Sequence, residues 1–450
     1  MQIITERSFK WQPILPYSLL GVGVSIAAYL LLSSRYSNSV GKYRFQRPEV
    51  GSVTQGIQQE IEFQQGRISQ QPTGGLDRAA LAQAYLKMAR ATGESSWYLL
   101  AEQTARQSLA QLSIHNYGAI LVLAKIAGAR HDFAQSVTLL KQMPPQHEAL
   151  ALSTTNHLAL GQVTIARQKA DTLVQRAPTL GNFALKALVE VAQGQDEAAI
   201  RDFQAAIAAE EPEEAGSSAW VRTLLGRFYS KRGQLQQAEE LYQSALDILP
   251  KYAPALLNLA ELSVRRGEFD RSQQLYDRFF LTNQKSPTIY DHVALRGLAR
   301  VQKLRGDLVT SHQTWERAVA RLRADLTGFG HRRELAQLLL ERGNSEDRLE
   351  ALKLMNVEIT ARQDAETWST LAAARLQMGE LIGAQEAIEA ALKSGIKDPG
   401  ITDRAAVIAQ ARGQSAQAEF YGRQVLEIDS RFNDGARQAL GLGVGLSGLN

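Results

Sequence analysis

The sequence predicts an all-α fold: a right-handed α-solenoid of stacked helix–turn–helix repeats, preceded by one N-terminal transmembrane helix. The main observation is a turn glycine followed by a polar residue, which recurs at steps of 33 to 39 residues. The composition agrees, because Pro is scarce (12 residues) and the helix-favouring Ala, Leu, Gln, Glu and Arg dominate. The recurring turn glycines are Gly161, Gly194, Gly233, Gly267, Gly306, Gly343, Gly379 and Gly413.

The length, charge and cysteine count of the chain limit the classes of protein to which it can belong. At 450 residues the chain is too long for one compact core, so several domains or a solenoid are expected. Lys and Arg (50) nearly balance Asp and Glu (46), so the net charge of +4 does not indicate nucleic acid as a partner. The absence of Cys excludes disulfides, thiolate metal ligands and a cysteine nucleophile.

The N-terminal region predicts a membrane anchor. Residues 1–13 form a short polar segment, and residues 14–32, from Ile14 to Leu32, carry no charge. A helix of this length spans roughly 28 Å, about the thickness of the hydrocarbon core of a bilayer. We expect an uncleaved anchor rather than a signal peptide, because the apolar run is long and no small-residue cleavage site follows Leu32. The sequence therefore predicts a single-pass membrane localisation.

The rest of the chain divides into three parts. Residues 33–74 form a juxtamembrane spacer rich in Ser, Gln and Gly, in which we expect one modest helix. Residues 75–432 form the superhelical repeat domain of about ten units, and residues 433–450 form a Gly-rich C-terminal tail. We expect its uncharged last stretch, residues 441–450, to be disordered. Slightly more basic residues follow the anchor than precede it, which leans the repeat domain toward the cytoplasmic side. The extracytoplasmic side remains an alternative.

The stretch from Ala219 to Tyr252 is the clearest repeat unit. It predicts two short amphipathic helices that are separated at Gly233. Small residues such as Gly226 allow the two helix backbones to approach closely, and Tyr242 fills the space beside them. A lone helix pair cannot bury both of its apolar faces, so it needs further copies stacked against it.

This unit resembles the tetratricopeptide repeat, a helical hairpin of ~34 residues. The resemblance rests on the order of seven residues: Leu225, Gly226, Tyr229, Ala238, Tyr242, Ala245 and Pro250. Another good copy contains Trp368, Leu371, Ala384, Ala391 and Pro399. For a member of this family, the resemblance implies a superhelix in which the first helix of each unit lines a concave surface that binds partner proteins.

A search for catalytic, cofactor and metal sites gives no candidate. His147 and Glu148 begin like a zinc-protease motif, but Ala151 stands where the second histidine ligand is needed. The glycines near the C-terminus have the spacing of a dinucleotide-binding loop, but no strand precedes them. We therefore expect a non-enzymatic protein without a cofactor. An enzyme with an atypical helical site is kept as an alternative.

The resemblance also implies a partner-binding strip, because residues one step around from the packing face would be available to a ligand. In the middle units this strip favours an acidic peptide segment or a C-terminal carboxylate. A known peptide-carboxylate clamp of the family is incomplete here, since Thr223 occupies the place of its Lys. The candidate residues are Arg227, Lys231, Asn258, Arg265, Arg296, Arg300, Lys303 and Arg333.

Alternatives remain open for these charges and for the function. The Arg and Lys side chains could be solvated surface charge, partly paired with Glu261, Glu240 and Asp270. The favoured function is a membrane-anchored scaffold that binds partner proteins or acidic peptide segments, with no nucleic acid as a partner. An extracytoplasmic accessory protein for envelope assembly or polysaccharide export is the first alternative. The sequence does not decide whether copies of the chain self-associate.

Overall fold

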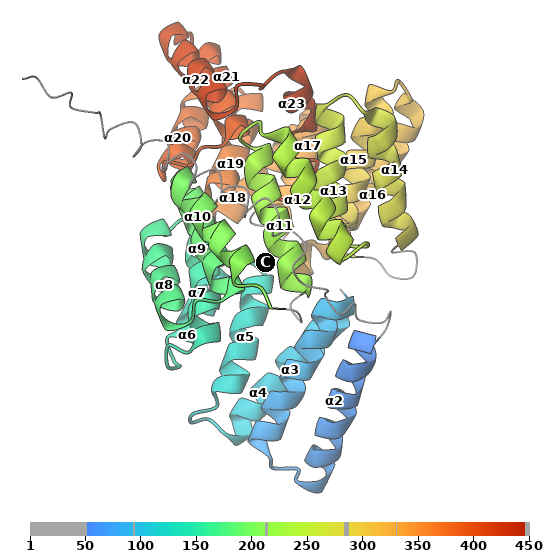
Figure 1. Ribbon diagram of the computed structural model, residues 1–450, viewed down its shortest axis with the longest axis vertical. Coiled ribbons are helices and arrows are strands. Elements are labelled where there is room, and N and C mark those ends of the chain that lie inside the picture. Colours follow the sequence, from blue (N-terminus) through green and yellow to red (C-terminus); the bar gives the residue numbers. More distant parts are fainter. Residues whose placement is uncertain (1–51, 93–94, 212–214, 283–287, 330, 446–450) are drawn as a thin grey trace, which may run out of the picture. The chain divides into compact units, whose positions relative to one another are not determined.

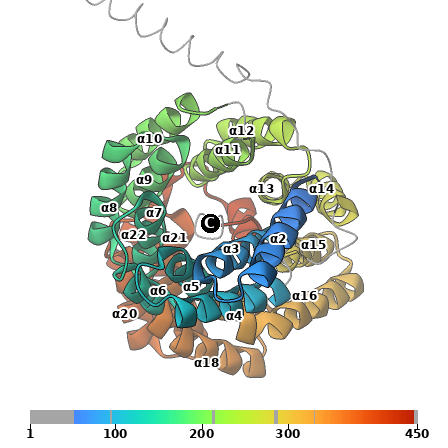
Figure 2. The ribbon, with the colours of Figure 1, turned by 90° about the horizontal axis from the view of Figure 1, so that it is seen from below.

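The computed structural model describes residues 52–92, 95–211, 215–282, 288–329 and 331–445. In these ranges the chain forms twenty-two α-helices and no strand (Figure 1). The prediction of an all-α solenoid of helical repeats is confirmed for this part of the chain. The ribbon in Figure 2 shows successive helix pairs following one another around a common central region.

The helices form ten consecutive pairs between one leading helix and one terminal helix, and each pair packs face to face. They are α2 (Ser52–Gln70); α3 (Gly75–Thr92) with α4 (Ser95–Gln111); α5 (Tyr117–Ala129) with α6 (Phe133–Leu140); α7 (His147–Ala159) with α8 (Val163–Arg176); α9 (Leu180–Ala192) with α10 (Asp196–Ala208); α11 (Ala215–Ser230) with α12 (Leu235–Ile248); α13 (Ala253–Arg265) with α14 (Phe269–Thr282); α15 (Asp291–Leu304) with α16 (Leu308–Phe329); α17 (Arg332–Arg342) with α18 (Ser345–Ala361); α19 (Ala365–Gln377) with α20 (Leu381–Leu392); α21 (Pro399–Ala411) with α22 (Ser415–Ile428); and α23 (Asp434–Ala439).

The pair α11–α12 packs as its small residues predict. A Cβ atom added to Gly226 would lie 2.6 Å from Cε1 of Tyr242, so only glycine leaves room for the tyrosine ring at this crossing. Tyr242 is fully buried, together with Ala238 and Ala245 on the same face of α12. The close approach of the two backbones that the sequence predicts is therefore confirmed.

The turns between the two helices of a pair require a left-handed residue. All eight glycines of the repeating rhythm have φ between 68° and 87°, which glycine adopts without the steric cost of a side chain. His131 takes the same place in the α5–α6 turn with φ 62°, although it is not glycine. The recurrence of glycine in the sequence thus follows from the backbone conformation of this turn.

The coil brings early turns against late connections. The backbone N–H of Gln363, before α19, donates to the carbonyl oxygen of Ala159, at the end of α7, at 2.7 Å. Arg232, in the α11–α12 turn, donates from Nη1 to the carbonyl oxygen of Lys397 at 2.6 Å. These contacts join residues more than 160 positions apart, so the second half of the superhelix lies on the first.

The predicted membrane localisation is corrected. In the described ranges, no helix combines the length and the apolar character that crossing a membrane requires. The predicted anchor at residues 14–32 lies outside the described residues, as do residues 1–13 and the beginning of the spacer. The single-pass anchor is therefore not supported, and it has no part in the function proposed below.

Residues 434–445 pack against the repeats, so the expectation of disorder for residues 441–450 is wrong for 441–445, the part of that stretch that the structure describes. This stretch begins with α23, which packs against α13, and continues as an irregular segment. Leu442 is fully buried and Val444 is 3% exposed, both in the same apolar core as Val221 and Leu257. Four apolar residues of this stretch are buried, including Ala436 and Ala439. Their burial stabilises the ordered stretch, although its Gly-rich composition alone would suggest disorder.

Candidate functional site

A cavity of about 2000 Å³ lies inside the superhelix. Its wall comes mainly from the first helices of the pairs, including α7, α15, α17, α19 and α21, as the family resemblance implies. Basic residues exceed acidic ones in this wall, eleven to six, so the cavity favours a ligand of negative charge. The basic residues are Lys125, Arg227, Lys231, Arg296, Arg300, Arg321, Arg333, Arg362, Lys393, Arg404 and Arg437. The acidic residues are Glu334, Glu341, Asp364, Glu366, Asp398 and Asp403.

The structure brings five of the eight predicted strip residues to this cavity wall. They are Arg227, Lys231, Arg296, Arg300 and Arg333. Asn258 and Arg265 lie close by, on α13 under the C-terminal residues 434–445. Lys303, near the end of α15, is exposed and does not line the cavity.

Most of the predicted basic residues are already paired with carboxylates. Arg227 is 4% exposed, and its Nη1 donates to Oε2 of Glu261 at 2.5 Å. Arg296 and Arg300 both pair with Glu341 on α17. Burial alone would raise the pKa of Glu341, but these two guanidinium groups outweigh burial and hold that pKa below its usual value. Arg227 therefore has the partner, Glu261, that the alternative reading named, whereas Arg296 and Arg300 pair with Glu341, which it did not name. The Arg227 pair is buried rather than solvated.

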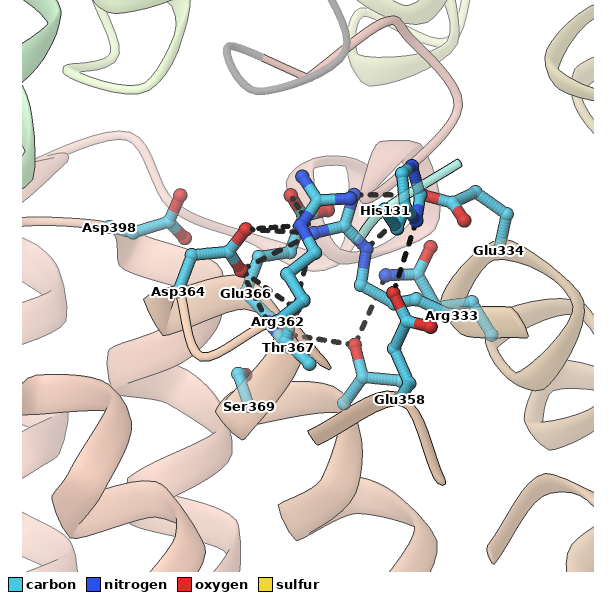
Figure 3. Close-up of polar contacts among 12 residues, drawn as sticks. His131, Arg333, Glu334, Glu358, Arg362, Asp364, Glu366, Thr367, Ser369 and Asp398 are labelled. Carbon is cyan, nitrogen blue, oxygen red and sulfur yellow. Dashed lines mark hydrogen bonds and ion pairs between the residues drawn. The ribbon is translucent and has the colours of Figure 1, made fainter. Parts of the chain in front are cut away.

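A second cluster of charges joins the α5–α6 turn to α17 and the α18–α19 connection (Figure 3). Arg333 donates to Glu334 at 2.8 Å and lies 3.3 Å from Asp364, while Arg362 donates to the same aspartate at 2.6 Å. Burial alone would raise the pKa of Asp364, but the two arginines lower it to about 2. Asp364 also accepts a hydrogen bond from the backbone N–H of Thr367, so it caps the first turn of α19.

The sequence did not single out most of this cluster. His131, on the turn before α6, lies 3.3 Å from the fully buried Glu358, although the two residues are 227 positions apart. The aspartate that caps α19 has a recognisable signal, since an Asp precedes a helical run. Glu358 and Arg362 have no such signal, because only the coil of the superhelix places them beside α5–α6 and α17.

Two cations of the wall stand out, because no ion pair holds them among the residues that the structure describes. Arg404, on α21, donates from Nη1 to the backbone oxygen of Ser369 at 3.2 Å, and Lys393 is exposed at the end of α20. Burial lowers the pKa of Arg404, which means that its charge lacks full compensation. An anionic group in the cavity would supply that compensation through a charge-assisted hydrogen bond.

One buried carboxyl group has a raised pKa, but it does not line the cavity. Glu190, on α9, is 2% exposed, and burial together with the nearby Asp202 raises its pKa to about 7. Its partner Lys186 is 4.0 Å away, which is too far to offset these effects. The group therefore affects stability rather than the site.

Glu190→Gln is expected to raise the melting temperature by about 2–4 °C at pH 8 and to leave it unchanged at pH 4. The folded state holds a proton on Glu190 up to about pH 7, whereas the unfolded chain releases it near 4.5. Stability therefore falls as the pH rises through this window, and the full penalty is present above pH 7. Thermal unfolding at both pH values tests this, with Glu197→Gln, whose side chain is 95% exposed, as control. An equal shift at both pH values would contradict the assignment.

The comparisons with known proteins agree with the repeat pattern. Residues 179–251 and residues 231–296 each match a family model described as tetratricopeptide repeat. These matches lie in the middle units and support the resemblance to that family. Repeats of this kind suggest a protein–protein interaction scaffold.

Individual relatives are distant or cover only part of the chain. A stretch of 65 residues is 34% identical to the uncharacterized protein ycf37 of Pyropia yezoensis, and it spans 14% of this chain and 36% of that protein. The solved APC/C hetero-tetramer Cut9-Hcn1 contains a chain that is 13% identical, with 87% of this chain and 95% of that chain covered and a TM-score of 0.35. A solved tetratricopeptide repeat protein from Parabacteroides merdae is 14% identical, with 65% of this chain and 98% of that chain covered and a TM-score of 0.29.

Proposed function

We propose that this chain, with its tetratricopeptide repeats, is a non-enzymatic scaffold that binds an acidic segment of a partner protein in the central cavity. The observation that carries the proposal is the excess of basic residues in the cavity wall, of which Arg404 and Lys393 form no ion pair within the described chain. A peptide carboxylate beside either side chain would receive a charge-assisted hydrogen bond worth about 1.5–3 kcal/mol.

The state of the cavity carboxylates supports binding over proton transfer. Neighbouring arginines or lysines outweigh burial at Glu341, Asp364 and Asp398 and lower the pKa of each of these groups. Carboxylates held in this ionised state are poor proton donors at neutral pH. They suit a rigid wall that presents fixed charges to a ligand.

The double substitution Arg404→Ala with Lys393→Ala is expected to raise the Kd for a Glu-rich synthetic peptide by about tenfold or more. Fluorescence anisotropy with the labelled peptide measures this, and added salt from about 50 mM to about 300 mM should weaken binding to the unaltered chain. Lys303→Ala is the matched control, since this exposed lysine lies outside the cavity. Equal loss in the control and in the double variant, or no loss in either, would reject the cavity as the binding site.

A further inference from the structure

The inner face of α11, α13 and α15 is covered by residues Asp434–Gly445, here called the C-terminal segment. Its α23 packs against α13 (Figure 1), and its residues Leu440, Gly441 and Gly443 to Gly445 contribute to the cavity wall. Leu442 and Val444 are buried in the core that α11, α13 and α15 also build. The chain itself therefore occupies a part of the surface that the partner would need.

The glycines of this segment pass close to the side chains of the predicted strip. A Cβ atom on Gly441 would lie 2.7 Å from Nη2 of Arg296. On Gly443 it would lie 2.3 Å from both Oδ1 of Asn258 and Oε2 of Glu261. The surface thus accepts a Gly–aliphatic alternation in which the glycines face the polar side chains and the aliphatic residues fill the core.

The polar side of this fit is incomplete. Asn258 is 1% exposed, and neither its Nδ2 nor its Oδ1 has a hydrogen-bond partner in the structure. An unpaired buried amide disfavours the closed arrangement. Arg300 donates to the backbone oxygen of Gln438 at 2.7 Å, and Arg437 reaches Asp403 on the exposed side. Burial of a few aliphatic side chains is therefore the main interaction that holds the segment. The buried amide of Asn258 beneath it forms no hydrogen bond with it.

We propose that the C-terminal segment is a displaceable intramolecular ligand of this inner face, and that an acidic partner segment reaches Asn258, and the sides of Arg227 and Arg296 that the segment covers, only after the segment leaves. This inference rests on the proposed function, because it concerns access to the same cavity. A tethered occupant competes at an effective concentration on the order of millimolar, so it sets a threshold that a partner must exceed.

The test variant is Gly443→Leu, because a side chain there collides with Asn258 and Glu261 on α13, while the substitution itself lies in the C-terminal segment and leaves the sequence of the repeats unchanged. Gly422→Leu on α22 is the matched control, since a Cβ atom at Gly422 meets nothing within 4 Å. The probe is a labelled synthetic peptide with the sequence of residues 434–450, added to each chain. We expect Gly443→Leu to bind this peptide at least about tenfold more tightly than the unaltered chain and the control do. Equal binding by all three would overturn the inference.

Hydrogen exchange on the unaltered chain gives a second measurement that needs no variant. Amide protons of residues 440–445 should exchange at least about tenfold faster than those of α13, because the segment opens without unfolding of the repeats. Exchange of both regions at one common rate would mean that the segment leaves only on global unfolding, and the inference would fail.

The Glu-rich peptide used above separates this inference from the proposed function. Binding of the 434–450 peptide to Gly443→Leu, with no binding of the Glu-rich peptide to any chain, would support the displaceable segment and reject the acidic partner. Equal binding of the Glu-rich peptide to the unaltered chain and Gly443→Leu, with no binding of the 434–450 peptide, would support the acidic partner and overturn the gating segment.

Discussion

Asp429→Asn is expected to lower the free energy of unfolding by about 3–5 kcal/mol, the usual cost of removing one partner of a buried ion pair. Asp429 is fully buried after α22 and accepts a hydrogen bond from Nη2 of Arg265 at 2.6 Å. The side chain of Arg265 is itself only 9% exposed, so replacing the carboxylate with a neutral amide would leave the arginine charge buried without a counter-charge. Chemical denaturation followed by circular dichroism measures the loss.

Asp270→Asn is the matched control for this substitution. Asp270 also pairs with an arginine, Arg305 at 3.0 Å, but its side chain is 82% exposed. Exposed pairs contribute about 0–1 kcal/mol, so we expect little change. A loss at Asp429 as small as that at Asp270 would mean that water reaches the Arg265 pair, and that the late part of the coil does not close on the early part.

The Arg265 pair also shows where sequence reasoning stops. The turn rhythm and the packing of Tyr242 on Gly226 are predictable, because both depend on residues within one repeat. The partner of Arg265 lies 164 positions further along the chain. That distance depends on the pitch of the superhelix, which results from small rotations summed over many repeats and leaves no local pattern.

The candidate site was predictable to the same extent. Arg227, Arg296 and Arg300 each lie beside the packing face of a first helix, so the pattern placed them on the inner side, where they line the cavity. Lys303 fails because it stands at the exposed end of α15, beyond the part of the helix that faces the cavity. Arg404 was missed because the repeats at the C-terminal end match the family pattern weakly, which left the inner face of α21 unassigned.

The last part of the C-terminal segment, residues 441–445, was misjudged for a different reason. A Gly-rich, uncharged stretch has the composition of a disordered tail when it is considered alone. Leu442 and Val444 become core residues only because the superhelix offers an apolar surface between α11, α13 and α15. The glycines that suggested disorder are the residues that allow the close approach to Arg296 and Asn258.

Gly194→Ala is expected to destabilise the protein by about 2–5 kcal/mol, because two costs combine. Gly194 has φ 68°, a left-handed conformation that costs an alanine about 1–2 kcal/mol. An added Cβ atom would also lie 2.1 Å from the carbonyl oxygen of Gly395, so the backbones of the α9–α10 turn and the α20–α21 connection must separate, at about 1–3 kcal/mol.

Gly379→Ala carries only the first of these two costs, so its comparison with Gly194→Ala isolates the second. Gly379 is the corresponding turn glycine between α19 and α20, with φ 79°, but a Cβ atom there meets nothing within 4 Å. The Gly379 variant should therefore lose only the stability that the left-handed conformation costs an alanine. The difference in unfolding free energy between the two variants then measures the contact between the early and late halves of the coil. Thermal and denaturant unfolding of both variants give this difference. Equal losses would mean that the two halves do not press on each other at Gly194, and the cavity between them would then lack its closing contact.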